Sequence, residues 1–315
     1  MTRFRSPEDQ VAARLIGGVW GHLVGDAVGV PYEFRDAAHF GPVQFGASGT
    51  HRQPPGTWSD DGALMLALLD SLLETGFDTA DQARRIVAWY RDKAYTPDAD
   101  GAFDVGNTTR AAISAIERGT PAEQAGGTDT HSNGNGSLMR ILPLALVHHR
   151  ADDRDLADMA HRASSVTHAT ERAQVACALY ALIATRLVRG SGGREALADA
   201  RSSLRALCAD DTHRLAALDH LEAYTERSGR GRVWDSFWSA WDAFADAGSY
   251  QETIERAIAY GHDTDTTAAI AGGLAGIHWG IDGIPADWRS GMRGREIVEP
   301  LVERLLARHG GAARG

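Results

Sequence analysis

The chain has 315 residues and a mass of 33.8 kDa, and 43% of its residues are hydrophobic while 23% are charged. A chain of this length and composition can bury a large core without disulfide bonds or metal ions to hold it together. It is therefore not a disordered protein, a collagen or a small disulfide-rich scaffold. The net charge is −10, from 32 basic and 42 acidic residues without a block of like charges, so a nucleic-acid groove or an anionic membrane surface is not expected as the main partner.

Helical periodicity dominates the chain. Apolar residues recur at spacings of three and four in segment after segment, while alternating β-branched runs of strand length are hard to find. We therefore predict an all-α protein that forms one large domain over residues 1–315. The predicted helices run, in chain order, over residues 7–28, 60–75, 79–93, 106–118, 137–149, 153–164, 168–189, 193–208, 211–227, 232–246, 250–260, 264–279 and 294–308.

Capping residues, prolines and glycines mark where helices begin and end. The segment Ser6–Asp9 provides an N-cap, a proline in the first turn and a capping box for the first helix. Pro143 and Pro300 are expected to kink or restart their helices. Residues 29–58 and 120–136 are rich in glycine, proline and polar residues, so we predict long loops, which in compact domains are usually functional or mobile.

The cysteines and the N-terminal segment bear on the compartment. Cys177 and Cys208 lie in apolar helical surroundings without a C-x-x-C motif, which is typical of buried thiols in a reducing compartment. The N-terminal segment lacks the order of a signal peptide, and no apolar run approaches the roughly 18 to 20 residues of a membrane span. We therefore expect a cytoplasmic monomer that has no membrane partner.

A first polar cluster, Ser59-Asp60-Asp61, stands at the start of the predicted helix over residues 60–75. Adjacent carboxylates and a hydroxyl offer the hard oxygen ligands that suit Mg²⁺, Mn²⁺ or Ca²⁺. Serine and aspartate are also favoured at helix N-termini, where they accept backbone hydrogen bonds and stabilise the helix dipole. Taken alone, capping is therefore the simpler interpretation of this cluster.

A second cluster opens the predicted helix over residues 264–279. Asp263, Asp265 and Thr266 repeat the same ligand chemistry, and a helix cap would explain one aspartate but hardly both. Four carboxylates from two clusters could neutralise two divalent ions, and two metals about 3.5 to 4 Å apart form a recurring hydrolytic arrangement. Together the two clusters exceed what capping requires.

Two glycine-containing segments add further candidates. In GDAVGVPYE, at the end of the first helix, glycines allow close backbone approach, and Glu33 could be solvated, metal-linked or a base. The segment SNGNGSLMR, residues 132–140, would expose backbone N–H groups before a helix, which is how many proteins hold phosphate. A flexible turn is the alternative for this segment, because it has neither a Walker nor a Rossmann spacing.

Two isolated residues remain ambiguous on local grounds. Asp104, in FDVGNTTR, could be a catalytic carboxylate, but capping of the following helix is the favoured local interpretation. His168, in THAT, is more typical of a structural histidine than of a ligand.

Jointly these segments resemble the ADP-ribosylglycohydrolase family. The matching pieces, in order over roughly residues 10–290, are GDAVGVPYE, GTWSDD, FDVGNTTR, SNGNGSLMR, THAT and HDTDTTAAIAGGLAG followed by IPADW. The resemblance implies a single-domain orthogonal helical bundle of about a dozen helices, with two Mg²⁺ or Mn²⁺ ions at the foot of a central ADP-ribose cleft. One departure is Gly62, where many members carry threonine after the double aspartate.

The resemblance also implies roles for individual residues. Asp104 is similar to the carboxylate of arginine-directed members, and Glu33 would be a further metal ligand or a catalytic carboxylate. His168 would contact the ribose or the diphosphate. The implied metal ligands are Ser59, Asp60, Asp61, Asp263, Asp265 and Thr266. The implied substrate-binding loop is Asn135, Gly136 and Ser137.

The expected activity is hydrolysis of the bond between the anomeric carbon of ADP-ribose and an acceptor, in an ADP-ribosylated protein or a small-molecule conjugate. Arginine-linked ADP-ribose is the first choice because of Asp104. The alternatives are serine-linked ADP-ribose, O-acetyl-ADP-ribose, an ADP-ribosylated nucleobase or small molecule, and a non-catalytic ADP-ribose-binding protein. An isoprenoid synthase would need D-D-x-x-D, a pattern that Gly62 and the residues after it do not provide.

Overall fold

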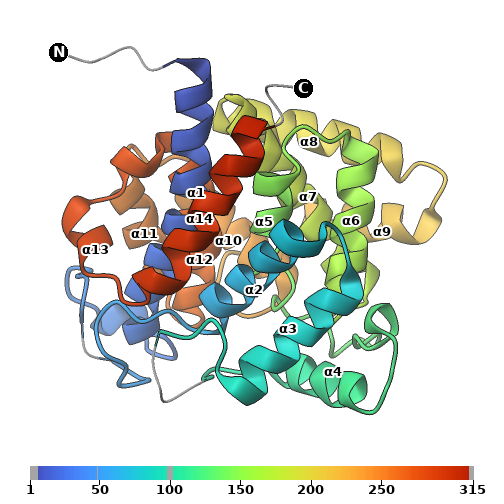
Figure 1. Cartoon of the computed structure of the whole chain (residues 1–315), viewed down its shortest axis with the longest axis horizontal. Helices are drawn as coiled ribbons and strands as arrows, with labels where there is room; N and C mark the ends of the chain where they lie inside the picture. Colours follow the sequence, from blue (N-terminus) through green and yellow to red (C-terminus); the bar gives the residue numbers. More distant parts are fainter. Residues whose placement is uncertain (1–5, 48, 98–101, 312–315) are drawn as a thin grey trace.

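A computed structural model describes residues 6–47, 49–97 and 102–311 of the chain. These residues form fourteen α-helices and four short 3-10 helices, with no β-strand, which confirms the predicted all-α bundle (Figure 1). The described helices include no candidate for a membrane-spanning segment. In chain order the helices are α1 (Pro7–Gly29), α2 (Asp60–Thr75), α3 (Thr79–Asp92), α4 (Asn107–Glu117), α5 (Leu142–Val147), α6 (Asp153–Ser165), α7 (Glu171–Arg189), α8 (Gly193–Leu207), α9 (Thr212–Ala223), α10 (Val233–Ala245), α11 (Tyr250–Ile258), α12 (Thr264–Trp279), α13 (Ala286–Ser290) and α14 (Arg295–Gly311).

Helices α1 and α12 pack backbone against backbone through glycine. A Cβ on Gly21 would lie 2.4 Å from the carbonyl oxygen of Gly272, and one on Gly25 would lie 2.2 Å from that of Ala268. A Cβ on Gly29, at the end of α1, would lie 2.5 Å from the Cα of Asp265, at the start of α12. The two helices are therefore antiparallel, and the C-terminal end of α1 meets the N-terminal end of α12.

Helix α7 runs through the core. Every residue from Val175 to Val188 is buried, as expected for a helix that is apolar on all sides. The hydroxyl of Tyr180 donates a hydrogen bond to the carbonyl oxygen of Ile270, which ties α7 to α12. Both cysteines are buried free thiols, as predicted.

Helix α2 is fixed at its start by α1. The buried carboxylate of Asp26 accepts hydrogen bonds from the backbone N–H groups of Ser59 (3.0 Å) and Gly62 (2.7 Å). Asp26 thus satisfies two of the unpaired donors at the N-terminus of α2. The ends of α1, α2 and α12 are in this way held together at one end of the bundle.

The predicted helix over residues 137–149 is wrong at its beginning. Residues 137–140 form turns, and α5 begins only at Leu142, because Pro143 fits the first turn of a helix. The predicted helix over residues 211–227 is too long, since α9 ends at Ala223. Helix α14 continues through Pro300 and does not restart there.

Candidate active site

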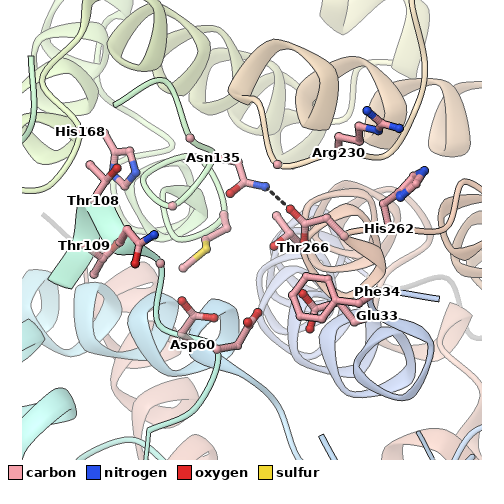
Figure 2. A pocket seen from close by; sticks show the side chains of 18 residues that line it. Glu33, Phe34, Asp60, Thr108, Thr109, Asn135, His168, Arg230, His262 and Thr266 are labelled. Atoms are coloured by element: carbon pink, nitrogen blue, oxygen red, sulfur yellow. Dashed lines mark hydrogen bonds between the residues drawn. The ribbon is translucent and has the colours of Figure 1, made fainter. Parts of the chain in front are cut away.

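A pocket of about 360 Å³ opens at the end of the bundle where α1 ends and α2, α4 and α12 begin (Figure 2). Eight of the twelve predicted site residues line it, and the remaining four lie buried behind it. The eight are Glu33, Asp60, Asp104, Asn135, Gly136, His168, Asp263 and Thr266. The four are Ser59, Asp61, Asp265 and Ser137.

The two aspartate clusters, some 200 residues apart in sequence, are in direct contact. The hydroxyls of Ser59 and Thr266 both donate hydrogen bonds to Oδ2 of Asp61, at 3.2 and 3.1 Å. Ser59 also caps α2, because its hydroxyl oxygen accepts the backbone N–H of Asp61. Capping therefore explains Ser59 but not the carboxylates.

The carboxylates of this group are in an unfavourable environment. Burial, followed by repulsion from neighbouring carboxylates, raises the pKa of Asp60, Asp61 and Asp265 well above the ordinary value. Burial also raises the pKa of Asp263. Oδ1 of Asp61 and Oδ2 of Asp265 are buried and have no hydrogen-bond partner within the described parts of the chain. Buried carboxylate oxygens without a partner are costly, and a bound cation would compensate for their charge.

The donor set fits hard divalent cations. Carboxylate oxygens of Glu33, Asp263 and Asp265 lie within 4.8 Å of one another, which is within the span of ligands around one ion. All of these donors are oxygens, and oxygen donors suit Mg²⁺ and Mn²⁺.

Asp104 lies in the pocket and does not cap α4. The N-cap of α4 is Gly106, which has no side chain to accept a hydrogen bond, so the capping interpretation of Asp104 is wrong. Burial and the charge of Asp263 raise the pKa of Asp104 to about 7, although a hydrogen bond with Glu33 opposes this rise. The backbone of Asp104 is left-handed, with φ of 57°, an uncommon conformation outside glycine that often accompanies a functional site.

Glu33 connects Asp104 to a residue that the sequence analysis missed. Burial, then the charges of Asp265 and Asp104, raise the pKa of Glu33 strongly. Nε2 of His51 contacts Oε2 of Glu33, and the ring of His51 lies 5.1 Å from that of Phe103. His51 lies in the predicted loop over residues 29–58, where no spacing rule connects it to Glu33.

The glycine-containing loop forms another wall of the pocket. Nδ2 of Asn135 donates hydrogen bonds to Oδ2 of Asp263 (2.7 Å, dashed in Figure 2) and to Oγ of Ser236 (2.9 Å). A Cβ on Gly136 would lie 2.8 Å from the ring of His168, so glycine is needed there for the close approach. The side chain of Ser137 points away from the pocket, because its Oγ accepts a hydrogen bond from the hydroxyl of Ser164.

His168 faces this loop from the base of α7. It is buried, and burial followed by the nearby Arg140 guanidinium lowers its pKa to about 3. Its imidazole is therefore neutral at physiological pH and can act there only as a neutral donor or acceptor.

The family model described as ADP-ribosylglycohydrolase matches residues 7–314. The chain belongs to the ADP-ribosylglycohydrolase family. It is an enzyme of that class, so the isoprenoid-synthase alternative is wrong. A Cβ on Gly62 of this glycohydrolase would lie 2.7 Å from Cγ of Trp58, so the threonine that many members carry would not fit without rearrangement.

Individual relatives of this glycohydrolase agree with the family assignment. It is 30% identical to "ADP-ribosylarginine hydrolase Tri1" of Pseudomonas putida, over 95% of this chain and 80% of the relative. It is 29% identical to "ADP-ribosyl-[dinitrogen reductase] glycohydrolase" of Rhodospirillum rubrum, over 93% of this chain and 96% of the relative. A solved structure, "ADP-ribosylglycohydrolase-related protein complex", superposes with a TM-score of 0.78 at 32% identity, over 96% of this chain and 99% of the other.

Proposed function

We propose that this glycohydrolase hydrolyses the N-glycosidic bond between ADP-ribose and an arginine side chain of an ADP-ribosylated protein. The observation that carries the proposal is Asp104, a carboxylate with no capping role that lines the pocket next to Glu33 and has a pKa raised to about 7. The relative from Pseudomonas putida, named an ADP-ribosylarginine hydrolase, supports the same linkage. We further propose that the enzyme is a single-domain cytoplasmic monomer; its buried free cysteines support the reducing compartment.

The proposal includes two divalent cations, Mg²⁺ or Mn²⁺. Glu33 would lie beside them as a further ligand or as a catalytic carboxylate. When bound, such cations supply positive charge that polarises the oxygen atoms of ribose and water. The residues that would hold them are Ser59, Asp60, Asp61, Asp263, Asp265 and Thr266.

The proton transfers fall to the carboxylates of Asp104 and Glu33. In the proposed reaction, water forms a C–O bond at the anomeric carbon while the C–N bond to the guanidine nitrogen breaks. A carboxylate whose pKa is raised by burial can both accept the proton of water and return it to the departing nitrogen. We assign this role to Asp104, because burial raises its pKa.

The remaining predicted residues would hold the substrate. In the Asn135–Ser137 loop the N–H of Asn135 already donates to the carbonyl oxygen of Gly231, so the N–H groups of Gly136 and Ser137 are the ones suited to phosphate oxygens. The start of α4, where Asn107 to Thr109 line the same pocket, offers further backbone N–H groups. His168, neutral and facing the loop, would donate a hydrogen bond to the ribose or to the diphosphate.

The test is release of free ADP-ribose from arginine-linked, serine-linked and O-acetyl ADP-ribose substrates, each with Mg²⁺, with Mn²⁺ and with a chelator. We expect turnover of the arginine-linked substrate that disappears with chelator, and a loss of at least about 100-fold in kcat for Asp104→Asn. Turnover of another linkage alone would replace arginine as the acceptor. Unchanged turnover by Asp104→Asn would remove Asp104 from the mechanism.

Asp26 offers a second prediction, because it holds the start of α2 and the aspartates that follow. Asp26→Asn is expected to weaken Mn²⁺ binding about 10-fold to 100-fold, since an amide nitrogen would face the backbone donors that the carboxylate now accepts. Mn²⁺ titration followed by electron paramagnetic resonance measures this.

The matched control is Asp36→Asn. Asp36 also accepts a backbone hydrogen bond, from Ala38 at 3.0 Å, but it is exposed and does not line the pocket. Equal Mn²⁺ affinities for the two variants would contradict the positioning role of Asp26.

A further inference from the structure

Among the described residues that line the pocket, Arg230 is the only lysine or arginine. The other charged groups of the lining are carboxylates, Glu33, Asp60, Asp104 and Asp263. Arg230 is exposed, and in the described part of the chain its guanidinium has no ion pair. Figure 2 shows Arg230 beside His262 at the edge of the pocket, across from Asp60.

The backbone that carries Arg230 is fixed although the side chain is free. The N–H of Arg230 donates to Oδ2 of Asp235 (3.0 Å), and the hydroxyl of Ser236 donates to the carbonyl oxygen of Arg230 (3.1 Å). Asp235 is itself buried and also accepts the N–H of Ser228 (2.9 Å). Because these hydrogen bonds already order the backbone of the segment, binding of a ligand to the Arg230 guanidinium would cost little backbone entropy.

The neighbours of Arg230 place it between two parts of the site. The N–H of Asp263, in the second aspartate cluster, donates to the carbonyl oxygen of Gly229 (2.9 Å). The N–H of Asn135, in the glycine-containing loop, donates to the carbonyl oxygen of Gly231 (3.2 Å). Arg230 therefore projects from a segment that joins the acidic residues to the loop.

We propose that Arg230 pairs with the diphosphate of the ADP-ribosyl group and so selects for ligands that carry it. This inference rests on the proposed function, because it takes ADP-ribose as the ligand of the pocket. The carboxylates of the pocket repel phosphate, and the backbone donors of the loop carry no net charge. A guanidinium supplies a positive charge that belongs to the protein and does not depend on bound cations, together with paired N–H donors that match the oxygen atoms of a phosphate.

The test is calorimetric titration of the whole protein with ADP-ribose, ADP and adenosine, with EDTA and separately with Mg²⁺. For Arg230→Gln we expect affinities for ADP-ribose and ADP that are about tenfold weaker, and an unchanged affinity for adenosine. Arg230→Lys should recover part of the loss, because it restores the charge without the paired donors. In turnover, KM should rise while kcat stays within about twofold.

Arg232→Gln is the matched control. Arg232 is an exposed arginine of the same segment, but its guanidinium donates to the carbonyl oxygen of Thr130 (3.4 Å) and does not line the pocket. Its variant should bind all three ligands as the wild type does.

Two results would overturn the inference. One is an unchanged affinity of Arg230→Gln for ADP and ADP-ribose. The other is an equal loss for adenosine, which would assign the side chain to the base. A failure of the proposed function alone would give a different result. The wild-type protein would then bind ADP and ADP-ribose through Arg230 but release no ADP-ribose from any conjugate.

Discussion

Gly25→Ala is expected to lower the melting temperature by roughly 5–10 °C, which corresponds to a loss of about 3 kcal/mol in the free energy of unfolding. The added Cβ would lie 2.2 Å from the carbonyl oxygen of Ala268 and 2.8 Å from its carbonyl carbon. Both are backbone atoms of α12, so no side chain can rotate away and the whole helix must shift. Thermal unfolding followed by circular dichroism measures the effect.

The same displacement should reach the active site. Ala268 lies within one turn of Asp265, so a shift of α12 away from α1 would separate the aspartates of α12 from those of α2. We therefore expect hydrolysis by Gly25→Ala to fall even below its unfolding temperature.

Gly310→Ala is the control, because Gly310 lies in α14 with no atom within 4 Å of its added Cβ. It should be neutral or slightly stabilising, since alanine favours the helix by about 1 kcal/mol over glycine. A melting temperature of Gly25→Ala equal to that of Gly310→Ala would contradict the backbone packing described here.

The glycines illustrate what the sequence could predict of this fold. Gly25 and Gly29 were interpreted as positions of close backbone approach, and Figure 1 shows α1 beside α12. The partner could not be predicted, because a glycine permits contact without selecting the helix that fills the space. The predicted helix ends were wrong where two local patterns disagreed. At α5 the apolar pattern favours an earlier start, but the helix begins at Leu142 with Pro143 in its first turn.

Some of the site residues could be predicted from the sequence and others could not. The two aspartate clusters could be predicted, because they hold more carboxylates than helix caps require. Asp104 was misread in its local context, since only the structure places the cap of α4 at Gly106. His51 and Arg230 carried no signal, because each reaches the pocket from a loop whose path depends on tertiary contacts.

Asp265→Asn is expected to abolish hydrolysis, with a loss of more than about 100-fold, and yet to stabilise the EDTA-treated protein by about 1–2 kcal/mol. Asp265 is fully buried, and neighbouring carboxylates together with burial raise its pKa well above the ordinary value. An amide would keep the acceptor that now receives the N–H of Thr266. It would also replace the unpartnered Oδ2 by a donor toward Glu33 and Asp263.

The pH dependence of stability follows from the same shifts. A carboxyl group with a raised pKa holds more protons in the folded state than in the unfolded state, so the free energy of unfolding falls as pH rises between the two pKa values. For Asp26 and Asp104 that window runs from the ordinary aspartate value of 3.8 to about 7, and the raised pKa of Asp265 acts in the same direction. EDTA-treated wild type should therefore melt at a lower temperature at pH 7 than at pH 5.

Melting temperatures at pH 5 and pH 7, with EDTA and with Mn²⁺, distinguish the effect of the buried carboxylate charges on stability from the effect of cation binding. Mn²⁺ should raise the wild-type value at pH 7 and raise that of Asp265→Asn much less, because a ligand that binds only the folded state stabilises it in proportion to its affinity. Asp210→Asn, at an exposed aspartate outside the pocket, should behave as wild type throughout. If Asp265→Asn were less stable than wild type in EDTA at pH 7, the buried carboxylates would not be the source of strain, and the main physical argument for a cation site would fail.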